Sequence, residues 1–235
     1  MKRFYRDVAV APGENGHRIL LDGRPIGTPA KQLLVVPTIP LAEAIAEEWR
    51  GQGDTIRPQA MPVTRLASTA LDRMPAQRRA VIEEVVAYAD TDLVCYRVAE
   101  PFELVQRQHR SWQPMLDWLG QTYGVRLAVT TSLLPVAQPA AARARLRGAV
   151  EDLSDWPLVG MHMATTALGS LVLGLGLLHG RLDAEAALAA SLLDELFEIE
   201  RWGSDVEAER RLQALRRDVS AAARFLASLD QRSSL

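Results

Sequence analysis

The sequence has very little cysteine and lysine, and both shortages limit what the protein can be. Cys95 is the single cysteine among 235 residues, so no disulfide can form within the chain and a reducing compartment is favoured. Lys2 and Lys31 are the only lysines among 27 basic residues, and the formal net charge is -2. A chain this close to neutrality has no strong electrostatic attraction to nucleic acid or to anionic lipid. We therefore expect no nucleic-acid partner.

Motifs of the common catalytic and metal sites are also missing. The chain contains no G-x-x-x-x-G-K-[ST] phosphate-binding loop and no G-x-S-x-G serine motif. Its histidines, His17, His109, His162 and His179, are scattered and show none of the spacings of a zinc site. The apolar neighbours of Cys95 predict burial and not a reactive thiolate. We expect no catalytic, cofactor-binding or metal-binding residues.

Asp90 and Asp92 form a close pair of carboxylates, which can serve acid/base chemistry or hold Mg²⁺. Residues two apart face opposite ways in an extended chain, and Asp is common in turns. We therefore favour a turn in which one Asp caps a helix and the other pairs with an arginine. The alternative is a small-molecule enzyme using Asp90, Asp92 and a histidine. Convergence of these side chains in one pocket would support it.

Residues 158–178 contain no Asp, Glu, Lys or Arg and are about long enough to span a bilayer. Polar residues such as His162 and Thr165, together with several glycines, lower the hydrophobicity of this stretch. A helix that is apolar on all sides lies either in a membrane or in a protein core. We expect a buried central helix and no membrane insertion. The amino terminus shows neither the apolar segment of a signal peptide nor an Arg/Ser-rich presequence, so export is not expected.

Short strands are predicted over residues 4–36. Asp22-Gly23 suits a type I′ turn, because both central residues of that turn need positive φ, and it predicts a hairpin. Pro25 follows the turn and indicates an edge strand. A helix is then predicted from Thr38 to Gly51, and a short helical segment capped by Thr64 is predicted to follow.

Beyond Met74-Pro75 the pattern is mainly helical. We predict a β-rich domain with one helix over residues 1–74 and a helical domain over 75–235, which makes an α+β protein. The helices of the second domain are expected at residues 81–88, 104–119, 143–153 and 155–178, with Asp155 as the N-cap of the last. Residues 126–136 look extended and are candidates to pair with residues 93–97.

The clearest helical patterns lie near the carboxyl end. Asp183 can cap a helix that Gly203 ends, and Ser204-Asp205-Val206-Glu207 reads as a capping box for the next one. The expected buried seam of the first helix is Leu188, Leu192, Leu196 and Ile199. That of the second is Ala208, Leu212, Leu215, Val219, Ala222, Leu226 and Leu229, with alternating spacings of four and three.

Glu195, Glu198 and Arg201 lie off that seam and predict a charged stripe on one helix face. A solvated face with weak ion pairs is the simplest interpretation. The tryptophans are expected mainly in the core, although an exposed one would make a good interface anchor.

Eight short segments, in the order given, form a recognisable set: Phe4-Tyr5, Leu21-Asp22-Gly23-Arg24-Pro25, Thr28-Pro29-Ala30-Lys31, Val36-Pro37-Thr38, Glu48-Trp49, Met61-Pro62-Val63-Thr64-Arg65-Leu66-Ala67, Tyr88-Ala89-Asp90-Thr91-Asp92-Leu93 and Asp194-Glu195 through Trp202-Gly203-Ser204-Asp205. Together they strongly resemble the ATP12 family, whose members are assembly chaperones of the F1 sector of ATP synthase.

The resemblance implies a small β-rich domain followed by a larger helical one, with no catalysis and no cofactor. Family members bind the unassembled α subunit of F1 and shield the surface that later meets the β subunit. The resemblance also makes the acidic helix before the Trp-Gly pair important. Its partner-binding candidates here are Glu195, Glu198, Trp202 and Asp205, and at Glu198 many relatives carry Gln.

The family occurs in mitochondria and in related bacteria, so we expect a bacterial cytoplasmic protein, or a mitochondrial matrix protein if the source is eukaryotic. A monomer is expected. A homo-oligomeric scaffold is the other alternative, which a large self-complementary apolar patch would support.

Overall fold

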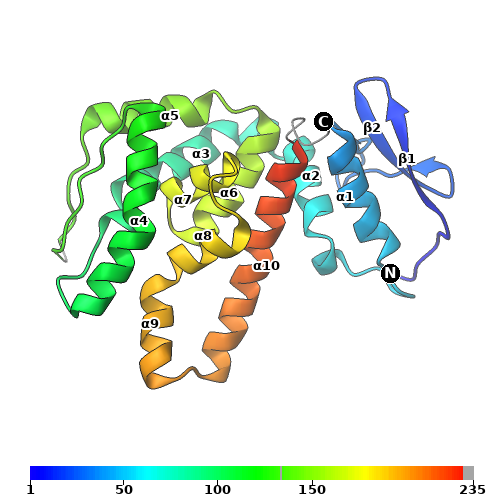
Figure 1. The fold of residues 1–235 in the computed structure, drawn as a ribbon. Coiled ribbons are helices and arrows are strands. Elements are labelled where there is room, and N and C mark those ends of the chain that lie inside the picture. Colours follow the sequence, from blue (N-terminus) through cyan, green and yellow to red (C-terminus); the bar gives the residue numbers. More distant parts are fainter. Residues whose placement is uncertain (133, 230–235) are drawn as a thin grey trace.

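The computed structural model describes residues 1–132 and 134–229 and places a small antiparallel sheet at one end of an array of helices (Figure 1). The strands are β1 (Val8–Gly13), β2 (Gly16–Leu21), β3 (Arg24–Pro25) and β4 (Val35–Val36). Their order is β1-β2-β3, and β4 also pairs with β2. The predicted α+β class is confirmed.

The hairpin between β2 and β3 turns where the sequence predicts. Asp22 and Gly23 have φ values of 47° and 78°, as a type I′ turn requires. The Asp22 carboxylate also accepts hydrogen bonds from the backbone N–H groups of Arg6 and Asp7, at 3.0 and 2.8 Å. Pro25 lies on the edge strand β3, as predicted. Proline has no N–H to donate, and at an edge no further strand needs that hydrogen bond.

Helix α1 (Ile39–Arg50) packs on β1 and β2, and α2 (Pro62–Asp72) follows the 3-10 turn η1 (Pro58–Ala60). The predicted cap of α2 by Thr64 is wrong. Glu48 of α1 accepts hydrogen bonds from the N–H groups of Val63 and Thr64, both at 2.8 Å, and so satisfies the first turn from outside. A cap from a residue this far back in the sequence has no local signal.

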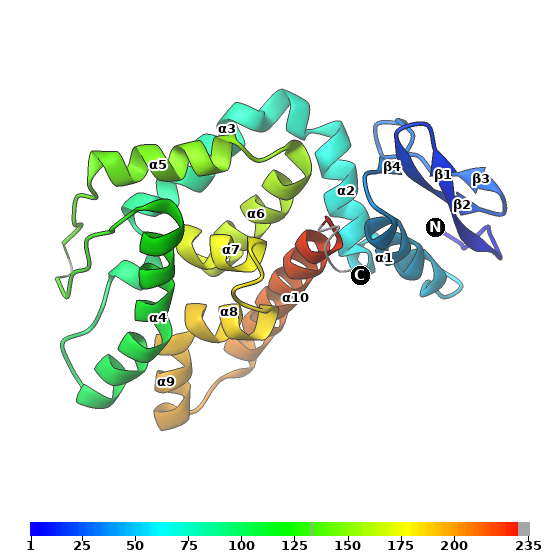
Figure 2. The same cartoon turned by 45° about the horizontal axis from the view of Figure 1, so that its top comes forward.

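The remaining helices form the larger part of the molecule (Figure 2). They are α3 (Met74–Ala87), α4 (Phe102–Tyr123), α5 (Ala140–Glu151), α6 (Asp155–Leu168), α7 (Leu171–Leu178), α8 (Ala184–Ser191), α9 (Leu193–Trp202) and α10 (Val206–Leu229), with 3-10 turns η2 (Tyr88–Asp90) and η3 (Leu93–Cys95). Helix α6 packs along α10, and α3 and α7 pack against α6. Residues 126–136 meet residues 93–97 in one parallel bridge, between Tyr96 and Thr130, so the predicted pairing is confirmed as a single contact.

The sheet end is tied to the helical part through Thr38. Its hydroxyl caps α1 by accepting from the N–H of Leu41 at 3.2 Å and donates to the carbonyl oxygen of Ser228 near the end of α10, at 2.5 Å. Buried apolar residues continue from Tyr5 in the sheet end to Leu226 in α10. The domain boundary at residues 74 and 75 stays a prediction.

Residues 155–178 do not form the single helix expected, because the chain breaks between α6 and α7. Gly169 has φ of 65°, and Ser170 caps α7 by accepting from the N–H of Leu173 at 3.0 Å. Ser154 holds the N-cap position of α6, so Asp155 is the first helical residue and not the cap. The stretch is buried as predicted, and no helix within residues 1–132 and 134–229 has the length and apolar character needed to cross a membrane.

Asp92 explains the break before α7. Its carboxylate is fully buried and accepts hydrogen bonds from the Ser170 hydroxyl at 2.6 Å, from Val172 N–H at 3.0 Å and from Val94 N–H at 3.3 Å. It therefore joins η3 to the start of α7. Burial raises the pKa of Asp92 to about 6, against an ordinary value of 3.8. Asp90 instead pairs with Arg143 at 3.0 Å, so one Asp caps and the other meets an arginine, as predicted.

Residues 183–203 also form two helices instead of one. Asp183 caps α8 as expected, accepting from Ala186 N–H at 2.8 Å, but the chain bends at Leu192. After the bend α9 packs against α4, which a straight continuation of α8 along α10 would not reach. Within α9 the most buried side chain is Phe197, 2% exposed, while the seam residues Leu196 and Ile199 are half-buried.

The cap of α10 is displaced by one residue from the predicted capping box. Asp205, and not Ser204, accepts from Ala208 N–H at 2.7 Å, while the Ser204 hydroxyl donates to Glu209. The predicted seam of α10 is confirmed: Val219, Ala222 and Leu226 are buried, and Ala208, Leu212, Leu215 and Leu229 are half-buried.

Replacing Asp92 by Ala leaves the buried donors of Ser170 and Val172 without an acceptor, so we expect a loss of about 2–4 kcal/mol of unfolding free energy at neutral pH. The matched variant Asp90→Ala breaks one partly exposed ion pair and should cost at most about 1 kcal/mol. Chemical denaturation of both variants measures the difference. Equal losses would contradict the capping role of Asp92.

The raised pKa of Asp92 predicts that the unfolding free energy depends on pH. The folded protein keeps the Asp92 proton up to about pH 6, whereas the unfolded chain releases it near pH 3.8, so the native state binds more protons between these values. The stabilising contribution of Asp92 should therefore be largest below about pH 4 and decrease as the pH rises towards about 6. We expect the stability difference between the wild type and Asp92→Ala to shrink over this range, and a difference that grows would refute the assignment.

Candidate functional site

The groups weighed as catalytic candidates make structural contacts. Asp90 and Asp92 have different partners, Arg143 and the start of α7. Cys95 is buried, and burial raises the pKa of its thiol to about 12. His179 hydrogen-bonds with the Tyr123 hydroxyl at 2.5 Å. Among the described residues no three potential ligands gather as a metal site would require.

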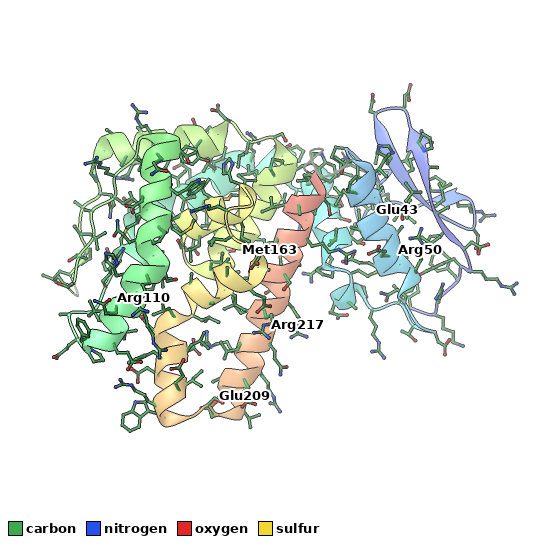
Figure 3. All side chains as sticks on the ribbon, in the orientation of Figure 1. Glu43, Arg50, Arg110, Met163, Glu209 and Arg217 are labelled. Atoms are coloured by element: carbon green, nitrogen blue, oxygen red, sulfur yellow. The ribbon has the colours of Figure 1, made fainter. Side chains whose placement is uncertain are left out.

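The acidic motif lies at a protruding end of the molecule. Helix α9 and the first part of α10 reach beyond the neighbouring helices, joined by residues 203–205 (Figure 1). We call this end, residues 194–209 with the start of α4 beside it, the tip. Figure 3 labels Glu209 on the part of α10 that belongs to the tip.

A cluster of charges around one aromatic ring holds the tip against α4. Arg107 of α4 pairs with Glu200 of α9 and with Glu103 of its own helix, both at 2.8 Å. Arg201 of α9 pairs with Glu103 at 3.2 Å. Both guanidinium groups also lie over the ring of Phe197, at 5.1 Å for Arg107 and 4.2 Å for Arg201. Hydrogen bonds from the two arginines lower the pKa of Glu103, so its carboxylate is ionised at neutral pH.

The predicted charged stripe is only partly right, because its members face different helices. Glu195 pairs with Arg211 of α10. Arg201 turns to Glu103 of α4 and makes no ion pair with Glu198. Glu198 is exposed and has no ion-pair partner in the part of the chain that the structure describes. Its charge adds to the effect of burial in raising the pKa of Asp194.

The other two candidates also lie at the tip. Trp202 ends α9 with 81% of its surface exposed, whereas Trp112 is only 1% exposed, so the general expectation for tryptophan fails at Trp202. Asp205 is the N-cap of α10. Residues 198–205 thus present the large exposed ring of Trp202. The free carboxylate of Glu198 precedes it in the sequence, and the capping carboxylate of Asp205 follows it.

Two exposed apolar residues of the tip were missed from the sequence. Phe102 is the first residue of α4 and is 77% exposed, and Val206 is the first residue of α10 and is 63% exposed. The Glu103–Arg201 pair brings the start of α4 to the end of α9, where Trp202 lies. Exposure at a helix start has no periodic signal, so only the fold reveals that Phe102 and Val206 are exposed.

The tip is also strongly acidic. Residues 194–209 carry a single base, Arg201, against these acids: Asp194, Glu195, Glu198, Glu200, Asp205, Glu207 and Glu209. Arg201 is itself held by Glu103. Exposed apolar residues within a field of one sign suit a protein interface with a polar rim.

Comparison with known proteins identifies the family of this chain. The family model of the ATP12 chaperone protein matches residues 2–120. Mitochondrial protein atp12 of Schizosaccharomyces pombe is 26% identical over 215 residues, covering 86% of this chain and 74% of that protein.

Solved structures are similar over almost the whole chain. Atp12 from Paracoccus denitrificans superposes with a TM-score of 0.92 at 39% identity, covering 97% of this chain and 98% of that one. A protein from Agrobacterium tumefaciens gives 0.90 at 39% identity, covering 97% and 86%. The chain therefore belongs to the ATP12 family of chaperone proteins.

Proposed function

We propose that this protein is an assembly chaperone of the F1 sector of ATP synthase, which binds the free α subunit and covers the surface that later meets the β subunit. The observation that carries the proposal is the similarity to Atp12 over 97% of the chain at 39% identity. An unassembled subunit exposes an apolar interface that promotes aggregation, and a reversible binder removes that surface from solution. The task needs neither catalysis nor a cofactor.

The tip is the surface proposed to bind the α subunit. Trp202, Phe102 and Val206 supply apolar anchors, and tryptophan is among the residues that most often dominate binding energy. Glu198, Asp205 and Glu207 surround them and would steer a basic surface of the partner. The cluster on Phe197 fixes the end of α9 before binding, which lowers the entropy cost of association.

The relatives include a mitochondrial protein and bacterial ones. The protein is proposed to act as a monomer in the bacterial cytoplasm, or in the mitochondrial matrix if its source is eukaryotic. A homo-oligomeric scaffold would use the exposed residues Phe102, Trp202 and Val206 against a second copy. Size-exclusion chromatography at several concentrations separates these alternatives.

The direct test mixes the purified protein with freshly synthesised α subunit in the absence of β. We expect the α subunit to stay soluble and to co-elute with the protein, whereas assembled F1, in which the interface is already covered, should not be captured. Equal aggregation of α with and without the protein would refute the proposal.

Exchange of the charges of Glu195 and Arg211 separates binding from folding. Glu195→Lys alone should weaken capture of α several-fold at low salt, and less at high salt, because charge steering is screened. The double variant Glu195→Lys, Arg211→Glu restores an ion pair between α9 and α10 with reversed charges. Because the exchange also restores the net charge of the region, the double variant should regain the long-range steering but not a direct contact of Glu195, and it should bind between the single variant and the wild type. Full recovery would remove Glu195 from direct contact with the α subunit.

Trp202→Ala should weaken capture about tenfold or more, as truncation of an interface anchor does. Its ring is 81% exposed, so the thermal transition should not move measurably. Ile39→Ala, at a site 57% exposed on α1 and remote from the tip, is the matched control and should bind like the wild type. Normal binding by Trp202→Ala would remove this residue from the proposed interface.

A further inference from the structure

A groove with a volume of about 310 Å³ lies where α8 and α9 face α10, and its lining includes Leu196 and Glu209 of the tip. It is lined by Glu185, Leu188, Ala189, Leu192, Leu196, Glu209, Leu212, Gln213 and Arg216. Of these residues, Figure 3 labels Glu209, on the first half of α10. The lining of the groove does not include the exposed residues Phe102, Trp202 and Val206.

The floor of the groove is apolar and incompletely covered. Leu188 and Leu192 are buried beneath it, whereas Leu196 of α9 and Leu212 of α10 are only half-buried. Ala189 is exposed at the wall that α8 provides. The bend at Leu192 creates this opening, because α9 turns towards α4 and leaves the leucines that face α10 partly uncovered. Two facing helices with such a floor can accept an apolar side chain from another protein.

The charges around the groove leave an acidic excess. Arg216 is paired with Glu185 at 3.4 Å, and Arg211 is paired with Glu195. Glu209 accepts a hydrogen bond from the Ser204 hydroxyl at 2.9 Å and has no cationic partner among the residues described. The nearby tip is acidic as well. A segment bound here would therefore be favoured by basic residues beside its apolar one.

We propose that this groove receives an apolar side chain of the client protein, from a segment that carries basic residues. The inference rests on the proposed function, in which the client is the free α subunit, and it adds a second contact to that of the tip. A volume of about 310 Å³ suits one or two side chains. The apolar part of its lining is leucine and alanine, and two of its charged residues, Glu185 and Arg216, pair with each other.

The test fills the groove without altering the core. Ala189→Phe places a ring in the groove from an exposed position on α8, and Ala144→Phe makes the same change at an exposed position on α5, which does not line the groove. We expect Ala189→Phe to weaken capture of the free α subunit about tenfold or more, with Ala144→Phe binding like the wild type. Thermal unfolding of both variants checks the fold. Ala189→Leu, which adds less volume, carries the test if the phenylalanine variant does not fold.

A fluorescent label reports occupation of the groove directly. Cys95 is buried with a raised thiol pKa, so a maleimide dye will react at an introduced cysteine and not at Cys95. With an environment-sensitive dye, Ala189→Cys should shift to shorter wavelength when the α subunit binds, and Ala144→Cys should not.

The outcomes distinguish the two proposals. Failure of the wild type to capture the α subunit overturns the proposed function and this inference with it. Normal capture by Ala189→Phe, or an unchanged Ala189→Cys signal while α binds, overturns the groove alone. A change in self-association without a change in capture would make a second copy of the chain the occupant, and would also overturn it.

Discussion

The arrangement at the tip depends on the packing of two arginines on one buried phenylalanine ring. Phe197 is 2% exposed, and Arg107 and Arg201 cover it from α4 and α9 while pairing with Glu103 and Glu200. Exposed ion pairs alone contribute about 0–1 kcal/mol each, and a cation over a ring adds roughly 0.5–2 kcal/mol. Because Arg107 and Arg201 lie on the same ring, their ion pairs and ring contacts stabilise one arrangement of α4 and α9. A hydrogen bond of 2.7 Å from the buried Gln108 of α4 to Asp194 holds the other end of α9.

Helix α10 links this end of the molecule to the other. Its first turn is capped by Asp205 at the tip, its middle packs along α6, and Ser228 near its end accepts the hydrogen bond from Thr38 at the start of α1. A surface presented at the tip is thus carried by the longest helix of the protein, which is anchored in the core and beside the sheet. A rigid support of this kind lowers the entropy cost of any association at the tip, because little conformational freedom remains to be lost.

The sequence predicted those features that local chemistry determines. Asp22-Gly23 requires positive φ at both residues, Asp183 can cap only the helix after it, and the seam of α10 repeats over its whole length. The failures share a different cause. The break before α7 depends on Asp92, the start of α2 depends on Glu48, and the bend at Leu192 depends on the packing of Phe197 against α4. Each depends on a contact with a residue from a distant part of the sequence. The periodicity of the local apolar residues carries no information about such a contact.

Exposure was the hardest property to predict at the candidate site. Trp112 and Trp202 are the same residue type near opposite ends of the exposure range, although tryptophan as a residue type is expected mainly in the core. The candidate residues of the motif that resembles the ATP12 family lie together at one end of the molecule, but they divide between roles. Glu195 faces α10, Asp205 caps a helix, and only Glu198 and Trp202 are free of such contacts.

The central claim is that the protein and the β subunit use the same surface of the α subunit. The most direct measurement is a competition in which a preformed complex of labelled α subunit with this protein is titrated with β, while the amounts of bound and released protein are followed. The account predicts that β displaces the protein in proportion to α–β formation, and that no complex of all three accumulates. A stable complex containing α, β and this protein would contradict it.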